Sequence, residues 1–382
     1  MAGGKNTHMT HLAESIITDG KQGGKDAIEL LKMMSGFLSG DPKSKVKVTT
    51  KWDGSPAVVC GIDPSDGQFF VGTKSVFNKN DPKVAKSVKQ IQEIYQGGVV
   101  PKLVDAFNYL KDAGIKGVLQ GDLMFTNDKK METINGDRLV TFRPNTITYA
   151  IDPNTKLGKQ INKASLGIVF HTKYTGATLA EMKSSFDVKE SDYKASKSVW
   201  IQRAEFTDIS GAASMTKTER KNYEAAVRRA EGSLKQTGSM LDDIQSGKAT
   251  LGFDTEFLKF FNGYVKAGKD IPSVEKAYSD YLHHLGKEYD KSIKPLKRLE
   301  SQIKKTEKFV NSVEFITSNT HRFKMIIATY MNLEFCNKIL VNKMKVVTSL
   351  RLFVNMGDRY ETTSPEGFVC ISSGGAVKLV DR

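Results

Sequence analysis

The sequence contains few cysteines, and none of them form a closely spaced pair. Among 382 residues only Cys60, Cys336 and Cys370 are present. Without a Cys-x-x-Cys pair, the sequence offers neither the ligand spacing of a structural zinc site nor a disulfide framework. Cys60 and Cys370 lie in apolar runs, where we expect buried thiols that pack as small hydrophobic groups.

Long hydrophobic runs are also absent. No stretch approaches the roughly 18–20 apolar residues of a membrane-spanning helix, and the opening MAGGKNTHMTHLAESI lacks the apolar core of a signal peptide. We therefore expect a cytoplasmic protein, located in the host cytoplasm if a phage encodes it, with no membrane partner. Nothing in the sequence indicates an obligate protein partner.

A P-loop is missing as well, because Gly23-Gly24-Lys25 lacks both the upstream glycine and the following Ser or Thr. Positive charge, in contrast, is abundant. The chain has 57 Lys and Arg against 43 Asp and Glu, a formal net charge of +14. Such an excess favours a polyanionic partner, most commonly nucleic acid. The alternative is a generally basic protein whose charges are simply solvated.

The pattern of apolar residues divides the chain into four parts. Residues 1–45 predict a polar arm and a helix, 46–189 are rich in strand patterns, 190–345 are helical, and strands return over 346–382. Residues 191–345 hold 27 Lys and Arg against 19 Asp and Glu, more than half of the net charge. The simplest architecture is an α+β core interrupted by a basic helical insertion.

Lys51 lies in the stretch VTTKWDGSPAVVCG, at residues 48–61, where we predict that a strand begins. Side chains alternate along a strand, so Lys51 and Asp53 are expected on one face. Gly54 would permit a close approach of backbone or ligand. A lysine can act as a nucleophile when its surroundings keep it deprotonated. The pattern is short, so a solvated strand end is the alternative.

Several other ionisable residues interrupt apolar strands. Asp122 lies within GVLQGDLMF, His171 follows Phe170 in LGIVFHTKY, Glu366 precedes a glycine in SPEGFV, and Lys378 lies within AVKLV. A charge in an apolar strand is costly unless it has a partner. Their recurrence predicts strands that converge on a polyanionic ligand. For His171 alone, a hydrogen-bonded structural histidine is the more common role.

The order and spacing of these segments resemble the covalent nucleotidyltransferase superfamily, which comprises ATP-dependent polynucleotide ligases and mRNA-capping guanylyltransferases. The likeness is greatest to the phage-type RNA ligases. KWDGS, at 51–55, is similar to the first motif, whose lysine becomes nucleotidylated. EGFV, at 366–369, resembles the fourth motif, whose acid works with the metal. VKLV, at 377–380, resembles the fifth motif, whose lysines hold the α-phosphate.

Three further matches are looser. GTKS, at 72–75, resembles the second motif and indicates Lys74 as its basic residue. Gly121-Asp122-Leu123 resembles the third, where the family usually has a glutamate contacting the ribose. IVFH, at 168–171, is similar to the motif whose aromatic residue, here Phe170, stacks on the base. Val380 departs from the fifth motif, which usually has a second lysine at that position.

The resemblance covers residues about 46–176 and 346–382. It implies an ATP-grasp-like antiparallel-sheet nucleotidyltransferase core with an α-helical insertion. Because the sequence ends four residues after Lys378, we expect no C-terminal OB-fold. It also implies catalytic roles for Lys51, Asp53, Glu366 and Lys378, metal binding by Glu366, and nucleotide binding by Lys51, Gly54, Lys74, Asp122, Phe170 and Lys378.

The implied activity is that of an ATP-dependent RNA ligase. It would join 5′-phosphate and 3′-OH ends through a lysyl-AMP intermediate, using ATP and Mg²⁺ or Mn²⁺, with RNA as the expected partner and DNA as the alternative. A guanylyltransferase that uses GTP and a DNA ligase are rival enzymes. A catalytically inactive nucleic-acid-binding protein is the rival from another class.

Overall fold

A computed structural model of the protein describes residues 10–39, 41, 46–194, 196–206, 213–247, 253–267, 269–347, 350–357, 359–372 and 375–380. These residues form two compact units. The described part of unit 1 lies within Thr49–Thr207 and Thr348–Glu366. Unit 2 takes its residues from Thr7–Val48, Asp208–Val347 and Gly367–Arg382. Both helices and antiparallel sheets are present, so the α+β prediction is confirmed. Residues 1–9 of the predicted polar arm lie outside the described residues.

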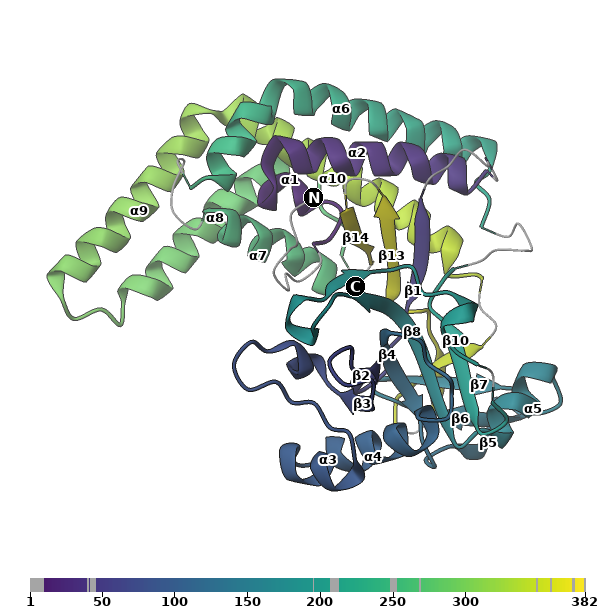
Figure 1. Cartoon of the computed structure of the whole chain (residues 1–382). Coiled ribbons are helices and arrows are strands. Elements are labelled where there is room, and N and C mark those ends of the chain that lie inside the picture. The colour runs from purple at the N-terminus through teal and green to yellow at the C-terminus, as the bar shows by residue number, and fades with distance from the viewer. Residues whose placement is uncertain are drawn as a thin grey trace. The chain divides into compact units, whose positions relative to one another are not determined.

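Unit 1 contains two sheets (Figure 1). The first has the order β10-β8-β4-β2-β3, with β9 paired to β8, and the second has the order β12-β11-β7-β6-β5. The pairs within both sheets are antiparallel except for the parallel pair of β8 and β10. The strands are β2 (Ala57–Ile62), β3 (Phe69–Gly72), β4 (Val118–Phe125), β5 (Lys130–Ile134), β6 (Asp137–Phe142), β7 (Ile147–Ile151), β8 (Leu166–Thr175), β9 (Lys183–Ser185), β10 (Val199–Arg203), β11 (Arg351–Asn355) and β12 (Tyr360–Thr362).

Apolar side chains cover both faces of the first sheet. On one face, Leu119 and Phe170 pack in a core with residues of α3 (Val88–Ile94) and α4 (Val99–Leu110). On the other face, Trp200 joins a second core with residues of β6 and β7. Its ring lies parallel to that of Phe125 at a centroid distance of 6.0 Å. The unit also contains α5 (Lys156–Lys163) and the short 3-10 helices η1 (Lys74–Phe77), η2 (Leu179–Glu181) and η3 (Glu190–Asp192).

Unit 2 is mainly helical. Its helices are α1 (Ser15–Thr18), α2 (Gly20–Phe37), α6 (Lys217–Gln245), α7 (Phe253–Lys266), α8 (Val274–Ile293), α9 (Leu299–Ser318) and α10 (Thr320–Met344). A small sheet of order β1-β13-β14 contains β13 (Gly367–Ser372), β14 (Gly375–Leu379) and β1 (Lys47–Lys51), whose last residues belong to unit 1. Helix α2 runs alongside α6 (Figure 1), and the hydroxyl of Tyr223 donates to the carbonyl of Leu31 at 2.8 Å.

The predicted domain boundaries are wrong in two respects. The N-terminal helix and the C-terminal hairpin belong with the helical block and not with the strand-rich part. The reason lies in their packing. Cys370 of β13 contacts Met34 of α2, and the Asn337 side chain on α10 donates to the Val380 carbonyl. Strand β10 also lies within the segment predicted to be helical. A strand of five residues has only a weak sequence signal, and pairing with β8 stabilises it.

Within the described ranges, no helix combines the length and the apolar character that crossing a membrane requires.

Glu334 of α10 predicts a pH effect on stability. Burial raises the pKa of its carboxyl to about 7, and the charge of Glu14 acts in the same direction. Because a glutamate in the unfolded chain titrates near about 4.3, the folded protein binds this proton more tightly. The contribution of Glu334 to stability is therefore complete at low pH and is lost as the pH rises towards 7.

We expect Glu334→Gln to match the wild type at pH 4 and to be more stable by about 1–3 kcal/mol at pH 8. Urea unfolding at both pH values measures the difference, with Glu314→Gln at an exposed position of α9 as the control. An equal gain at both pH values would contradict the titration argument.

Candidate functional site

Lys51 and Glu366 meet in unit 1. Lys51 is the last residue of β1, so it ends a strand and does not begin one as predicted. Its ammonium forms an ion pair with the carboxylate of Glu366, which lies just before β13. Both side chains are partly exposed, at 28% and 38% respectively, so a ligand can reach them. The structure therefore brings together Lys51 and Glu366, the two residues that the resemblance assigns to the first and fourth motifs.

Asp53 is a buried anchor for the loop that follows Lys51. Its carboxylate accepts hydrogen bonds from the Asn145 side chain at 2.8 Å and from the backbone amides of Thr146 and Ile147 at 2.8 and 2.7 Å. These bonds tie the loop to the start of β7. The catalytic role expected for Asp53 is thus better described as positioning, because its oxygen atoms are already engaged by three donors.

Tyr149 of β7 lies at the centre of this arrangement. Its hydroxyl accepts a hydrogen bond from the backbone amide of Asp53 at 2.8 Å, and its ring stacks on Trp52 at a centroid distance of 5.5 Å. Burial raises the pKa of the Tyr149 hydroxyl, and the negative charges of Asp53, Glu366 and Asp122 raise it further. Three acidic residues from distant parts of the sequence therefore gather around one neutral phenol.

Gly54 allows the loop to lie directly against β4. A Cβ atom at this position would come within 2.4 Å of the Asp122 Cβ and 3.0 Å of the Met124 sulfur. The group that approaches this glycine closely is therefore β4 of the same protein. It places Asp122 beside the loop that carries the KWDG sequence.

We expect Gly54→Ala to destabilise the protein by about 1–3 kcal/mol, because the added methyl group overpacks the contact with Asp122. The displaced loop should also slow any reaction of Lys51. Thermal unfolding and adduct formation would measure the two effects. Gly98→Ala is the matched control, since nothing lies within 4 Å of a Cβ there. Equal stability of both variants would contradict the packing argument.

His171 is brought towards Asp122 by an irregularity in β8. The register shifts between Gln120 and Gly121, which pair with Thr172 and Phe170, so His171 has no partner on β4. Its Nε2 lies 3.7 Å from the Asp122 carboxylate, while its Nδ1 is hydrogen-bonded to the Thr172 hydroxyl at 2.7 Å. Bulges commonly redirect side chains next to functional sites. This one adds an imidazole to the acidic cluster.

Phe170 does not have the position expected of a base-stacking residue. It is fully buried in the core that Leu119 and Leu123 of β4 share with α4. Asp122 lies between those two leucines in β4 and therefore points to the opposite face. The stacking prediction is corrected: Phe170 is a core residue with no open ring face.

The two remaining predicted cations have different surroundings. Lys74 begins η1, directly after β3, where its exposed side chain forms no ion pair with any described residue. Lys378 is half-buried in β14 of unit 2, where its backbone pairs with Thr10 and Leu12. Val380 is buried. The position at which the resemblance leads us to expect a second lysine is therefore occupied by a packed apolar side chain.

No motif in the sequence indicated Tyr149, Asn145 or Lys102. Tyr149 lies in β7, and Asn145 lies just before this strand. The sequence pattern of the strand indicated only burial. Lys102 of α4 donates to the Ser55 carbonyl at 3.0 Å, which places a further cation at the KWDG loop. A helical lysine far along the chain carries no local signal for such a contact. Among the described residues, no three His, Cys, Asp or Glu side chains already form a metal-binding group.

Comparison with known proteins identifies a family without assigning a function. Residues 6–382 match the family of unknown function DUF6267. The chain belongs to the DUF6267 family. No curated protein and no solved structure matches it. The DUF6267 match extends over both units. The region that matches the family therefore includes both the cluster around Lys51 and the helical part.

Proposed function

We propose that this DUF6267 protein is a covalent nucleotidyltransferase, specifically an ATP-dependent RNA ligase with a nucleotidyltransferase core and a helical insertion. The observation that carries the proposal is the ion pair of Lys51 with Glu366. The two residues are more than 300 positions apart, and the resemblance assigns them to the nucleophile and to the acid of the same reaction. The net charge of +14 further supports a nucleic-acid substrate.

Lys51 must lose a proton before it can attack, and the Glu366 carboxylate in contact with it can accept that proton. The neutral amine then attacks the α-phosphorus of ATP. A nitrogen–phosphorus bond forms, the bond to the β-phosphate oxygen breaks, and pyrophosphate leaves. Phosphoryl transfer of this kind depends mainly on positioning and on neutralisation of charge.

Two further transfers complete the proposed reaction. A 5′-phosphate oxygen of the nucleic acid attacks the AMP phosphorus and releases Lys51, which leaves an adenylylated strand end. The 3′-OH of the second strand attacks the 5′-phosphate, forms the new phosphodiester bond and expels AMP. Asp53, Tyr149 and Gly54 would contribute by holding the loop of Lys51 in place.

The acidic cluster suits a hard cation, because partly exposed carboxylates are the ligands that Mg²⁺ and Mn²⁺ prefer. Glu366 and Asp122, whose charges both act on the Tyr149 hydroxyl, would hold the ion, which when bound supplies positive charge to the phosphates. Lys74 is the exposed lysine that the resemblance assigns to nucleotide binding, and Lys378 is the one it assigns to the α-phosphate.

Intact-mass spectrometry after incubation with ATP or GTP and Mg²⁺ tests the proposal. We expect a gain of one AMP with ATP and no gain with GTP. A GMP adduct would instead indicate a guanylyltransferase. The absence of either adduct, together with salt-sensitive binding of RNA or DNA, would identify a catalytically inactive nucleic-acid-binding protein.

A further inference from the structure

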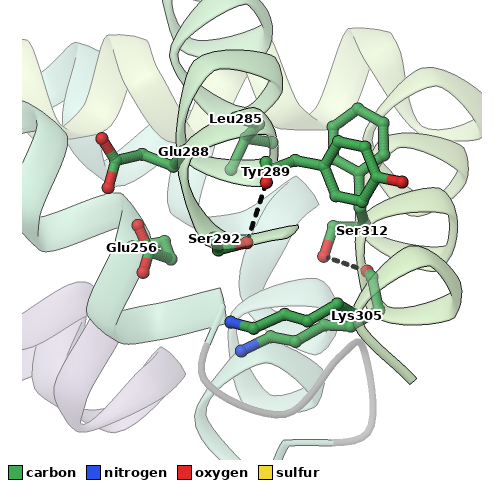
Figure 2. A pocket seen from close by; sticks show the side chains of 9 residues that line it. Glu256, Leu285, Glu288, Tyr289, Ser292, Lys305 and Ser312 are labelled. Atoms are coloured by element: carbon green, nitrogen blue, oxygen red, sulfur yellow. Dashed lines mark hydrogen bonds between the residues drawn. The ribbon is translucent and has the colours of Figure 1, made fainter. Parts of the chain in front are cut away.

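A pocket outside the Lys51 cluster lies within the helices of unit 2 (Figure 2). It has a volume of about 220 Å³ and is open to solvent. Helix α7 contributes one wall, α8 a second, and α9 a third. The lining residues are Glu256, Leu285, Glu288, Tyr289, Ser292, Lys305, Lys308, Phe309 and Ser312. None of them was indicated by a sequence motif.

Two lysines provide the cationic side of the pocket. Lys305 and Lys308 are one helical turn apart on α9, which places their side chains next to each other. Both are exposed, and no carboxylate among the described residues pairs with them. Figure 2 shows Lys305 reaching from α9 along the edge of the pocket. Neighbouring like charges repel, so an anion bound between them would relieve that repulsion.

The carboxylates of the pocket do not cancel this charge. Lys259 and Lys291 lie 2.6 and 3.0 Å from Glu288 and lower the pKa of its carboxyl to about 2. Glu288 is therefore ionised but already paired with two cations. Burial lowers the pKa of His284, which favours its neutral form. Glu256, the other carboxylate of the lining, has no Lys or Arg among the described residues within ion-pair distance, and it lies on α7 whereas Lys305 lies on α9 (Figure 2).

Glu256 has unused hydrogen-bonding capacity. Its Oε2 atom is buried and accepts no hydrogen bond among the described residues. The His284 Nε2 atom lies 3.9 Å from it and also lacks a hydrogen-bond partner among the described residues. Buried polar atoms are normally satisfied. The Glu256 side chain as a whole is 33% exposed and lines the pocket, so a ligand there can donate a hydrogen bond to its carboxylate.

An aromatic surface also lines the pocket. The rings of Tyr289 and Phe309 stack at a centroid distance of 4.5 Å and an angle of 18°. A hydrogen bond of 3.0 Å between the Tyr289 and Thr306 hydroxyls fixes the first ring. The pocket thus offers cations, apolar ring surface and a hydrogen-bond acceptor from its three helices.

We propose that this pocket binds a nucleotide unit, with the phosphate at Lys305 and Lys308, the base or ribose against Tyr289 and Phe309, and an amino or hydroxyl group donating to Glu256. A phosphate, a ring and a donor are the three groups that a nucleotide presents. All the residues that line the pocket belong to unit 2. That the nucleotide belongs to a substrate strand rests on the proposed function.

Binding of AMP and of a fluorescent 5′-phosphorylated oligoribonucleotide to the full-length protein tests this inference. In Lys305→Ala/Lys308→Ala we expect the binding of at least one of these probes to weaken about tenfold or more at low salt. Lys304→Ala is the matched control, because Lys304 is exposed on the same helix and pairs with Glu300 outside the pocket. It should change affinity less than twofold.

The two probes separate the sources of the ligand. Loss of oligonucleotide binding assigns the pocket to a strand, whereas loss of AMP binding alone assigns it to a free nucleotide. Glu256→Gln should weaken AMP binding and leave competition by inorganic phosphate unchanged. If inorganic phosphate competes as well as AMP and Glu256→Gln has no effect, the nucleotide assignment is overturned.

The outcome of this binding test does not depend on whether Lys51 forms an AMP adduct. If no AMP adduct forms on the wild type but the double variant loses nucleotide binding, the proposed ligase function fails and the pocket stands. If the adduct forms and the double variant binds both probes like the wild type, the pocket inference fails and the ligase function stands. All these lysines are exposed, so thermal unfolding should be nearly unchanged in the variants.

Discussion

Lys51→Arg is expected to abolish the AMP adduct while leaving the protein folded. The guanidinium of arginine stays protonated and cannot attack phosphorus, but it can retain the ion pair with Glu366. The variant therefore separates the nucleophilic role of Lys51 from its electrostatic role. Intact-mass spectrometry after exposure to ATP and Mg²⁺ measures the adduct, and thermal unfolding measures stability.

Lys89→Ala serves as the control, because Lys89 is a highly exposed lysine of unit 1 paired only with its helical neighbour Glu93. It should form the adduct at the wild-type level. An AMP adduct on Lys51→Arg would place the nucleophile on another residue. A variant that fails to fold would show that the larger guanidinium does not fit at this position, and Lys51→Met would then test the nucleophile without a cation.

Asp53→Ala is expected to destabilise the protein by about 2–4 kcal/mol. Three donors lose their acceptor, and the Ile147 amide is buried, so the desolvation penalty of an unsatisfied group is added to the lost bonds. The loop between β1 and β2 would also lose its attachment to β7. Urea unfolding measures the stability, and the adduct assay reports the position of Lys51.

Asp53→Asn gives an internal comparison, because an amide keeps one acceptor oxygen and should show an intermediate loss. Asp112→Ala, at an exposed position, should change stability by less than about 0.5 kcal/mol. If Asp53→Ala is as stable as the wild type but forms no adduct, Asp53 takes part in the chemistry and does not act only through the loop.

The sequence predicts the cluster around Lys51 better than it predicts the division of the chain. Lys51, Asp122 and Glu366 were each conspicuous as charged residues in apolar surroundings, and burial of charge requires partners. The division into units depends instead on contacts such as Tyr223 with Leu31, which are 192 positions apart. No local pattern indicates which amphipathic helix packs against which.

Phe170 was expected to stack on a base because of its motif, and no sequence pattern indicated the bulge that follows it. The bulge at His171 shifts the register of β8 against β4, so the faces of the residues on either side cannot be counted from one end of the strand. The resemblance indicated Phe170 as the candidate, whereas for His171 a structural role was the more common expectation. The structure places the aromatic ring in the core and the imidazole beside Asp122.

The interleaved path of the chain has a consequence for biosynthesis. Each unit combines early and late parts of the sequence, and a ribosome adds residues in order at about 5–20 per second. Glu366 is made more than 300 residues after its partner Lys51. A nascent chain therefore carries the lysine without its acid, and the cluster is completed only after Glu366 has left the ribosome.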